Sequence, residues 1–139
     1  MASIRKHITR EVVSLDAASP IRDAARLMAD RKIGSLGVKE DGKLVGLITE
    51  RDLVMTVLAR SGNVNGPIRE AMRGGIPRVK AEATEVDCAA VMRDHATRHL
   101  LVEDQGQIVG VVSMRDIIQL MLDEKQFLIE QLHTYIQGR

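Results

Sequence analysis

Residues 12–54 read VVSLDAASPIRDAARLMADRKIGSLGVKEDGKLVGLITERDLV, and residues 76–118 read IPRVKAEATEVDCAAVMRDHATRHLLVEDQGQIVGVVSMRDII. A shift of 64 positions aligns the two stretches without a gap, and identical or similar residues recur along their whole length. Two copies of one unit are expected to adopt the same local structure, so this repeat decides the fold. We place repeat 1 at residues 1–62, a linker at 63–67, repeat 2 at 68–126 and a C-terminal helical extension at 127–139.

Each repeat predicts the element order β-α-β-β-α. A short extended segment precedes a helix, which we expect over residues 20–31 and again over 84–95. A hairpin follows at 35–48 and at 99–112, with a two-residue turn that contains glycine in both copies. Another helix closes the repeat. This order predicts an α+β fold with helices on one face of a small sheet.

A repeat of about 60 residues buries only about 60% of the surface of its unfolded chain and is marginally stable alone. We therefore expect the two repeats to pack sheet to sheet about a pseudo-twofold axis. Such packing leaves two related clefts, and clefts at internal interfaces of this kind are favoured ligand sites.

The hairpin of each repeat ends in one motif: Gly, two apolar residues, Thr or Ser, any residue, Arg and Asp. The first copy is GLITERD at residues 46–52 and the second is GVVSMRD at 110–116. The hydroxyl and the carboxylate predict a capping box at a helix start, which does not explain why Gly and Arg recur. Exposed amide groups at a helix start can also bind an anion, and the carboxylate can accept from ribose hydroxyls. The residues concerned are Thr49, Asp52, Ser113 and Asp116.

The composition excludes several functional classes. Twenty Lys and Arg against 19 Asp and Glu give a formal net charge of +1, so no basic field attracts nucleic acid or a membrane surface. The only aromatic residues, Phe127 and Tyr135, lie in the last 13 residues, which leaves no stacking platform for single-stranded nucleic acid. No apolar run reaches the roughly 18 residues of a membrane span. The lone Cys88 suits a reducing compartment, and we expect a cytoplasmic protein.

We expect neither a metal site nor an enzyme active site. The histidines lack metal-ligand spacing, and no phosphate-binding loop or nucleophile motif is present. Nothing in the sequence assembles a nucleophile, a base and an orienting group. The four histidines are His7, His95, His99 and His133.

Residues 4–126 resemble a tandem pair of CBS (cystathionine-β-synthase type) domains, also called a Bateman module. The resemblance implies a regulatory module that binds an adenosine-containing ligand, such as AMP, ADP, ATP or S-adenosylmethionine, in the clefts and modulates a partner protein. It also implies that Thr49 with Asp52, and Ser113 with Asp116, hold the ribose.

Other contacts are implied less directly. Family members often carry basic residues before the hairpin to reach phosphate; repeat 2 has Arg98 and His99 there, whereas repeat 1 has Gly34 and Ser35. This difference predicts two unequal sites. Four further positions carry alternatives that the sequence leaves open. The adenine would lie near Val13 and Pro77, which can equally be core residues, and Arg51 and Arg115 can contact phosphate or remain solvated surface groups.

The C-terminal segment from Met114 to about Gln137 predicts one long amphipathic helix. A helix of that length spans about 35 Å, which is longer than one repeat can cover. We therefore expect its apolar face to pack on a second chain, giving a homodimer. The alternative to ligand sensing is a ligand-free interaction or dimerisation scaffold that acts through this helix.

Overall fold

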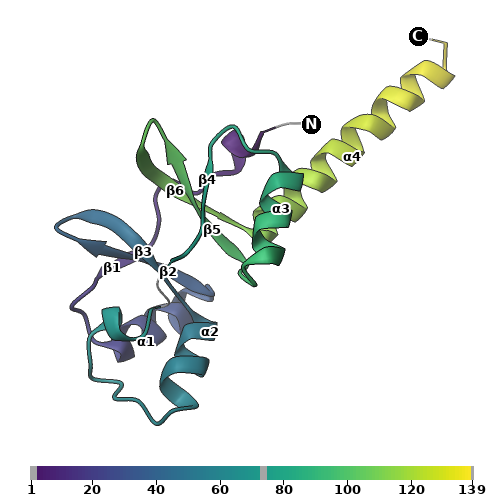
Figure 1. Ribbon diagram of the computed structural model, residues 1–139. Coiled ribbons are helices and arrows are strands. Elements are labelled where there is room, and N and C mark those ends of the chain that lie inside the picture. Colours follow the sequence, from purple (N-terminus) through teal and green to yellow (C-terminus); the bar gives the residue numbers. More distant parts are fainter. Residues whose placement is uncertain (1–2, 73–74, 139) are drawn as a thin grey trace. The chain divides into compact units, whose positions relative to one another are not determined.

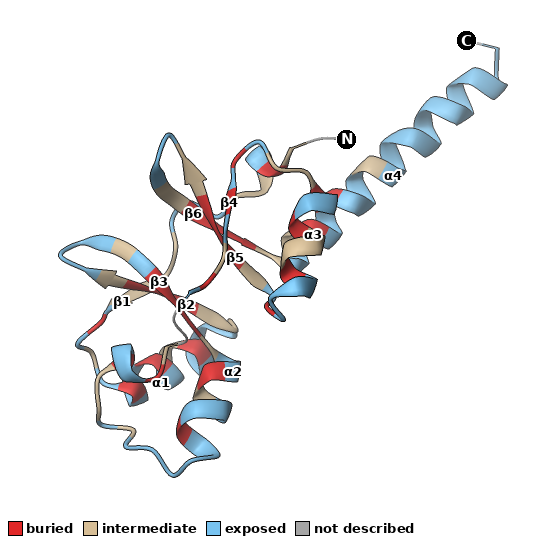
Figure 2. Ribbon diagram, in the orientation of Figure 1, coloured by how far each residue is buried: buried red, intermediate tan, exposed pale blue. Residues whose placement is uncertain are grey.

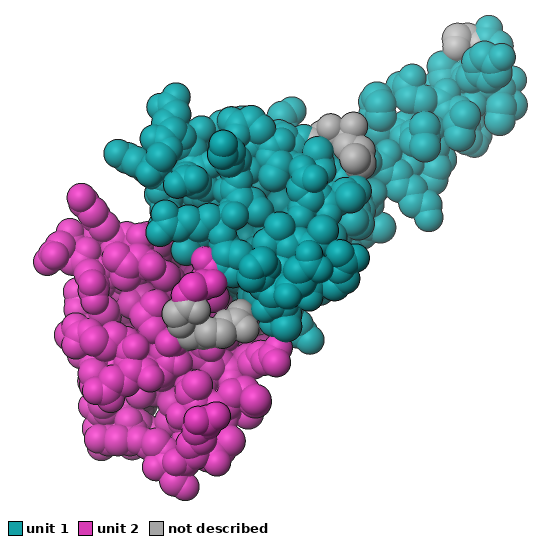
Figure 3. Space-filling view, in the orientation of Figure 1, with its two compact units in different colours: residues 1–10, 77–139 teal, residues 11–76 magenta. Residues whose placement is uncertain are grey.

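The computed structural model describes residues 3–72 and 75–138. The chain forms two compact units, one made of the described residues of 1–10 and 77–139 and the other of those of 11–76 (Figure 3). Each unit contains one three-stranded sheet and its own core, and the long C-terminal helix belongs to the first (Figure 1). The predicted α+β class is confirmed.

The two units repeat the same elements in the same order. In both, the first strand pairs in parallel with the second, and the second pairs antiparallel with the third. The unit of repeat 1 contains β1 (Ser14–Asp16), α1 (Ile21–Arg31), β2 (Ser35–Glu40), β3 (Lys43–Thr49) and α2 (Glu50–Asp52), which continues as a π-helical segment (Leu53–Leu58). The unit of repeat 2 contains β4 (Arg78–Lys80), α3 (Glu85–Asp94), β5 (His99–Asp104), β6 (Gln107–Ser113) and α4 (Met114–Ile136).

Local chemistry accounts for the hairpins. Both turn residues have positive φ, 50° at Asp41 with 75° at Gly42, and 51° at Gln105 with 78° at Gly106. Two left-handed residues in succession form the turn that matches the twist of a two-residue hairpin. Each hairpin also carries a register shift at the same place, after Val38 and after Val102.

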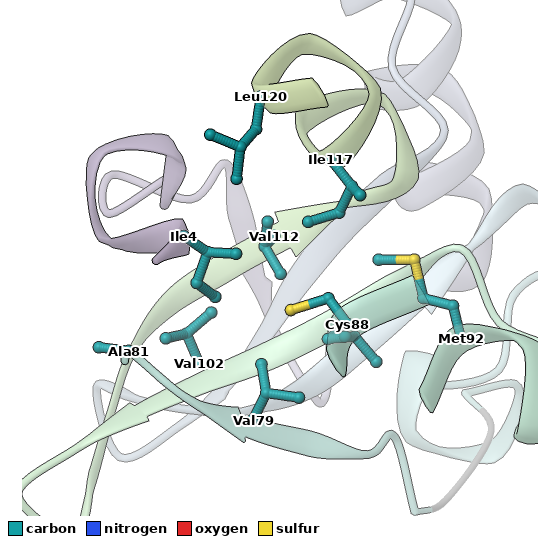
Figure 4. Packing of buried hydrophobic residues seen from close by; sticks show 10 residues of the cluster. Ile4, Val79, Ala81, Cys88, Met92, Val102, Val112, Ile117 and Leu120 are labelled. Carbon is teal, nitrogen blue, oxygen red and sulfur yellow. The ribbon is translucent and has the colours of Figure 1, made fainter. Parts of the chain in front are cut away.

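The sequence repeats and the compact units do not coincide. The short segment that begins each repeat, here called its leading segment, packs in the unit of the other repeat. The 3-10 turns η1 (Ile4–His7) and η3 (Ile68–Glu70) occupy equivalent sequence positions. Ile4 is fully buried in the core of repeat 2, and Ile68 is fully buried in that of repeat 1. Figure 4 shows Ile4 among side chains of β5 and β6. Each core is thus completed by a residue from the start of the other repeat.

Equivalent hydrogen bonds hold both leading segments. The amide of Ile4 donates to the Ala83 carbonyl at 2.8 Å, and the amide of Ile68 donates to the Ser19 carbonyl at 2.8 Å. In the unit of repeat 2, Thr9 also exchanges two backbone hydrogen bonds with Val111, at 2.9 and 3.0 Å.

This exchange explains the glycine of the motif. A side chain at Gly110 would collide with the carbonyl oxygen of Thr9, which crosses β6 at this point. A side chain at Gly46 would meet the end of the Met72 side chain, which follows the other leading segment. The backbone contact makes glycine necessary at Gly110, whereas at Gly46 the flexible end of Met72 can move aside.

Ile4 provides a direct test of the exchange. Replacing a buried isoleucine with alanine leaves a cavity, so we expect Ile4→Ala to lower the free energy of unfolding by about 2–5 kcal/mol. Urea denaturation measures this loss. Lys6→Ala is the matched control, because Lys6 is exposed in the same turn and its loss should change stability by no more than about 0.5 kcal/mol. Equal small effects from the two variants would contradict the exchange.

Cys88 is a buried core residue (Figure 4). Burial, followed by the negative charges of Asp87 and Glu85, raises the pKa of its thiol from the ordinary 9.0 to about 11. The raised pKa favours the neutral thiol in the folded chain. Its contribution to stability is present below pH 9.0 and is lost as the pH rises toward about 11.

We expect Cys88 to react slowly in the folded protein, because the thiolate is the nucleophile. At pH 8 its thiolate fraction should fall about a hundredfold below that of the unfolded chain, and alkylation by iodoacetamide should slow at least as much. Mass spectrometry with and without urea measures both rates. Similar rates in the two conditions would show that Cys88 is accessible.

Candidate functional site

The motif residues lie at the corner between the last strand of each sheet and the helix that follows. Thr49 is the N-cap of α2: its amide donates to Asp52 Oδ2 at 2.9 Å, and its Oγ1 accepts from the Asp52 amide at 3.1 Å. Ser113 caps α4 in the same way, with 2.8 Å to Asp116 Oδ2 and 3.1 Å from the Asp116 amide. The predicted capping boxes are confirmed.

The two carboxylates differ in burial and in their partners. Asp52 is 6% exposed, whereas Asp116 is half-buried. Asp116 Oδ2 also accepts from the Ser113 hydroxyl at 2.9 Å. In the described residues the hydrogen bonds recorded for both carboxylates use Oδ2, so capping leaves Oδ1 as a further acceptor.

The helix starts offer fewer amide donors than the sequence predicts. The first amide of α2, that of Glu50, donates to the Gly34 carbonyl at 2.9 Å, and that of Met114 in α4 donates to the Arg98 carbonyl at 2.8 Å. The third amide in each helix serves the capping box. Backbone carbonyls from the turn before the hairpin thus occupy the first position of each helix, and the capping box occupies the third. The anion-binding role expected for these helix starts stays a prediction.

The same contacts bring the predicted basic residues of repeat 2 to the motif. Arg98 lies against the first turn of α4 through its carbonyl, and His99 pairs with Ser113 across the β5–β6 ladder. Thr97, which sequence reasoning missed, fixes this corner: its buried hydroxyl donates to the His99 carbonyl at 3.1 Å and accepts from the His99 amide at 3.3 Å. Arg98 and Arg115 are exposed, and His99 is half-buried.

Repeat 1 places different chemistry at the equivalent corner. Gly34 and Ser35 replace the basic pair. The Glu50 side chain lies close to Gly34, because a Cβ atom added to this glycine would be 3.3 Å from Glu50 Oε1. Glu50 occupies the variable position of the motif, where repeat 2 has Met114. This difference was visible in the sequence as a carboxylate present in one copy only. Arg51 is exposed beside it.

The residues expected near adenine hold the first strand of each sheet. The Val13 carbonyl accepts from the Gly37 amide at 2.8 Å, and the Pro77 carbonyl accepts from the Leu101 amide at 3.1 Å. Both side chains are half-buried, and that of Val13 packs against the core of its unit. A structural role is thus established for Val13, and the adenine contact stays a prediction for both residues.

The capping role of Asp116 can be measured without a ligand. Asp87 forms the same box with Thr84 at the start of α3, with distances of 3.1 and 3.2 Å, and belongs to no predicted site. We expect Asp116→Ala and Asp87→Ala each to lower the free energy of unfolding by about 1 kcal/mol, because each leaves cap amides without their acceptor. Urea denaturation checks both values. If Asp116→Ala raised the free energy of unfolding while Asp87→Ala lowered it, the Asp116 carboxylate would destabilise the fold, which would contradict its capping role.

Comparison with known proteins identifies the family. A sequence profile described as the CBS domain matches residues 4–59 and 68–123. The chain belongs to the CBS domain family, whose tandem domains are generally regulatory modules that commonly bind adenosine ligands. Proteins built only from such domains are typically regulatory and non-enzymatic.

Individual relatives support this assignment. The CBS domain-containing protein YhcV of Bacillus subtilis is 28% identical over 117 residues, which is 84% of each chain. The crystal structure of an uncharacterized conserved protein from Pyrococcus horikoshii superimposes with a TM-score of 0.79 at 25% identity, covering 86% of this chain and 92% of that one. A putative signal-transduction protein with CBS domains from Burkholderia ambifaria gives 0.76 at 28% identity, covering 82% and 85%. Six other curated relatives are longer, and the chain spans 22% to 63% of their length.

Two kinds of feature are absent from the part of the chain that the structure describes. No helix within residues 3–72 and 75–138 has the length and apolar character to cross a membrane. In the same ranges, no cluster of three or more His, Cys, Asp or Glu side chains could hold a metal ion.

Proposed function

We propose that this pair of CBS domains is a ligand-sensing module that binds an adenosine-containing ligand, either an adenine nucleotide (AMP, ADP or ATP) or S-adenosylmethionine, and modulates a partner protein. One observation carries the proposal: both repeats place a hydroxyl and a carboxylate at a helix start, and capping uses only Oδ2 of that carboxylate. The second oxygen can accept from ribose hydroxyls while the cap stays intact. We predict from the sequence that the ligand lies in clefts between the repeats.

The corner of repeat 2 is the better candidate for a phosphorylated ligand. Arg98, His99 and Arg115 supply donors and positive charge around Ser113 and Asp116. At the corner of repeat 1, two carboxylates, Glu50 and Asp52, accompany the single Arg51. Their charge disfavours a phosphate, so we assign to repeat 1 a ligand or ligand part that carries none.

The adenine in this proposal lies against aliphatic side chains near Val13 or Pro77. The only Phe and Tyr of the chain both lie in α4, so an aromatic stack on the ring is not available from the sheets. Backbone groups of the first strands would supply hydrogen bonds to the ring edge.

The remaining partners belong to the same proposal. A regulated protein of unknown identity responds to the ligand, the chain acts as a homodimer, and it works in the cytoplasm, where a buried free thiol such as Cys88 stays reduced. Binding can shift a regulatory equilibrium only by the difference in ligand affinity between its two states.

A second candidate function is a ligand-free interaction scaffold that acts through α4. The observation in its favour is the exposure of large apolar side chains along that helix, including Phe127, Leu128 and Leu132. The two candidates differ in their response to nucleotides.

A thermal-shift panel with AMP, ADP, ATP, S-adenosylmethionine and NADH tests the ligand proposal. A ligand at about 100 times its Kd adds roughly 2.7 kcal/mol to the stability of the folded state. That increase should raise the Tm by several degrees. An unchanged Tm with every ligand would reject ligand sensing and favour the scaffold.

Two matched variants then locate the site. We expect Asp116→Ala to abolish the shift caused by a nucleotide, and Asp87→Ala to preserve it, although both lose one capping carboxylate. Asp52→Ala makes the same comparison for repeat 1. An unchanged ligand affinity in both Asp116→Ala and Asp52→Ala would refute the assigned ribose contacts.

A further inference from the structure

Glu85 is a buried carboxylate in the first turn of α3. Buried and exposed residues both occur along this helix (Figure 2), and Glu85 belongs to its buried side together with Cys88 and Met92. It is 4% exposed, and within residues 3–72 and 75–138 its Oε2 is buried without a hydrogen-bond partner. Burying a polar oxygen without a partner costs free energy. Glu85 therefore weakens the packing around it.

The equivalent position of repeat 1 holds an isoleucine. Ile21 lies 64 positions before Glu85 and is buried in the core of its unit. The chain around Ile68 covers it: the amide of Ile21 donates to the Gly66 carbonyl at 2.9 Å, and Ile68 packs in the same core. The two docking places for a leading segment therefore differ by a buried side chain that is apolar in repeat 1 and acidic in repeat 2.

The leading segment of repeat 1 docks beside Glu85. Ser3 forms an isolated β-bridge with Thr84, the residue before Glu85. The amide of Ile4 donates to the Ala83 carbonyl at 2.8 Å, and its side chain is fully buried in the core to which Cys88 belongs (Figure 4). The packing that Glu85 weakens thus includes the attachment of this segment.

A second buried atom without a partner lies on the segment itself. Over the described ranges, the buried side-chain nitrogen and oxygen atoms that lack a hydrogen-bond partner are His7 Nδ1 and Glu85 Oε2. The other ring nitrogen of His7, Nε2, lies 3.4 Å from Asp123 Oδ2. Both unpartnered atoms lie where the leading segment of repeat 1 docks on the unit of repeat 2. They make this docking less favourable than its apolar contacts alone would be.

The ion pairs of the segment lie at the surface. Arg5 lies 2.6 Å from Glu82 and 3.1 Å from Asp104, and the Arg5 side chain is 44% exposed. Exposed ion pairs contribute little to stability, and salt screens them. The buried Ile4 and the backbone hydrogen bonds therefore hold the segment in place.

The far end of the segment contacts the strand that carries the motif of repeat 2. Thr9 exchanges two backbone hydrogen bonds with Val111 in β6, which lies at the edge of its sheet. A side chain at Gly110 would collide with the Thr9 carbonyl oxygen. Val111 lies two residues before Ser113, the N-cap of α4. Release of the segment would free the strand that leads into the candidate site of repeat 2.

We propose that residues 3–9 form a strap that closes on the unit of repeat 2 and is poised to open, and that Glu85 sets this balance. In the closed form, Ile4 fills the core and Thr9 covers the edge of β6. In the open form, water reaches the Glu85 carboxylate, and its hydration offsets part of the lost packing. A ligand that binds the closed form better would shift the balance toward closing, and only this last step rests on the proposed function.

Native-state hydrogen exchange measured by NMR tests the strap without any ligand. The Leu101 amide, which donates to the Pro77 carbonyl in the same unit, is the reference for opening of the whole unit. We expect the amides of Ile4 and Thr9 to exchange at least about tenfold faster than the Leu101 amide. We expect Glu85→Ile to slow the exchange at Ile4 and Thr9 at least about tenfold relative to Leu101, because it removes the unpartnered oxygen.

Two further variants serve as controls. Asp94→Ile removes an exposed carboxylate from the other end of α3, so it should leave the exchange of the Ile4 amide unchanged. Ile21→Glu places the buried carboxylate in repeat 1 and should speed the exchange of the Ile68 amide. If Ile21→Glu does not fold, the comparison of Glu85→Ile with the wild type still decides the proposal.

Three results would overturn the strap. The first is equal exchange of the Ile4 and Leu101 amides in the wild-type chain. The second is exchange at Ile4 that stays as fast in Glu85→Ile as in the wild type, which would assign the fast exchange to something other than the buried carboxylate. The third is slowing at Ile4 without slowing at Thr9, because the segment would then not open as one piece. An unchanged Tm with every nucleotide would reject the proposed function and leave these exchange rates as they are.

Discussion

The exchange of two isoleucines is the constraint on which the rest of the structure depends. Ile4 completes the core of repeat 2 and Ile68 completes that of repeat 1, each from a segment that precedes the other repeat. A repeat of about 60 residues without aromatic side chains is marginally stable alone. Because each core includes an isoleucine from the other repeat, neither repeat can complete its core without the other. The exchange also accounts for Gly110, where a side chain would collide with the backbone of the segment around Thr9.

The helix starts combine structural and chemical roles in the same atoms. In each capping box the carboxylate satisfies backbone amides through Oδ2, and the backbone carbonyl of residue 34 or 98 satisfies the first helical amide. The first and third helical amides are therefore already bonded within the chain, and the neighbouring side chains become the main difference between the two corners. Those side chains differ between repeats: Arg98 and His99 surround one corner, and Glu50 stands at the other. Two sites with a common scaffold can thereby differ in the charge of the ligand they accept.

The α4 helix shows where the intramolecular core ends. Ile117 and Leu120 are its last buried side chains, and large exposed apolar side chains continue along it for more than four further turns. These side chains add nothing to the core of the unit that holds the base of the helix.

Local patterns in the sequence determined much of this protein: the repeat, the element order, the hairpin turns, the capping boxes and the extent of α4. The repeat is read by aligning the chain with itself, and each of the other signals depends on residues only a few positions apart, so all of them can be read without knowing the tertiary contacts. The leading isoleucines show where this reading ends. Ile4 and Ile68 are equally hydrophobic, and nothing local indicates which core receives which residue. The carbonyls of Gly34 and Arg98 were also unreadable, because main-chain groups have no sequence signature. Only the tertiary structure decided these contacts, since they join residues far apart along the chain whose pairing depends on the packing of the whole unit.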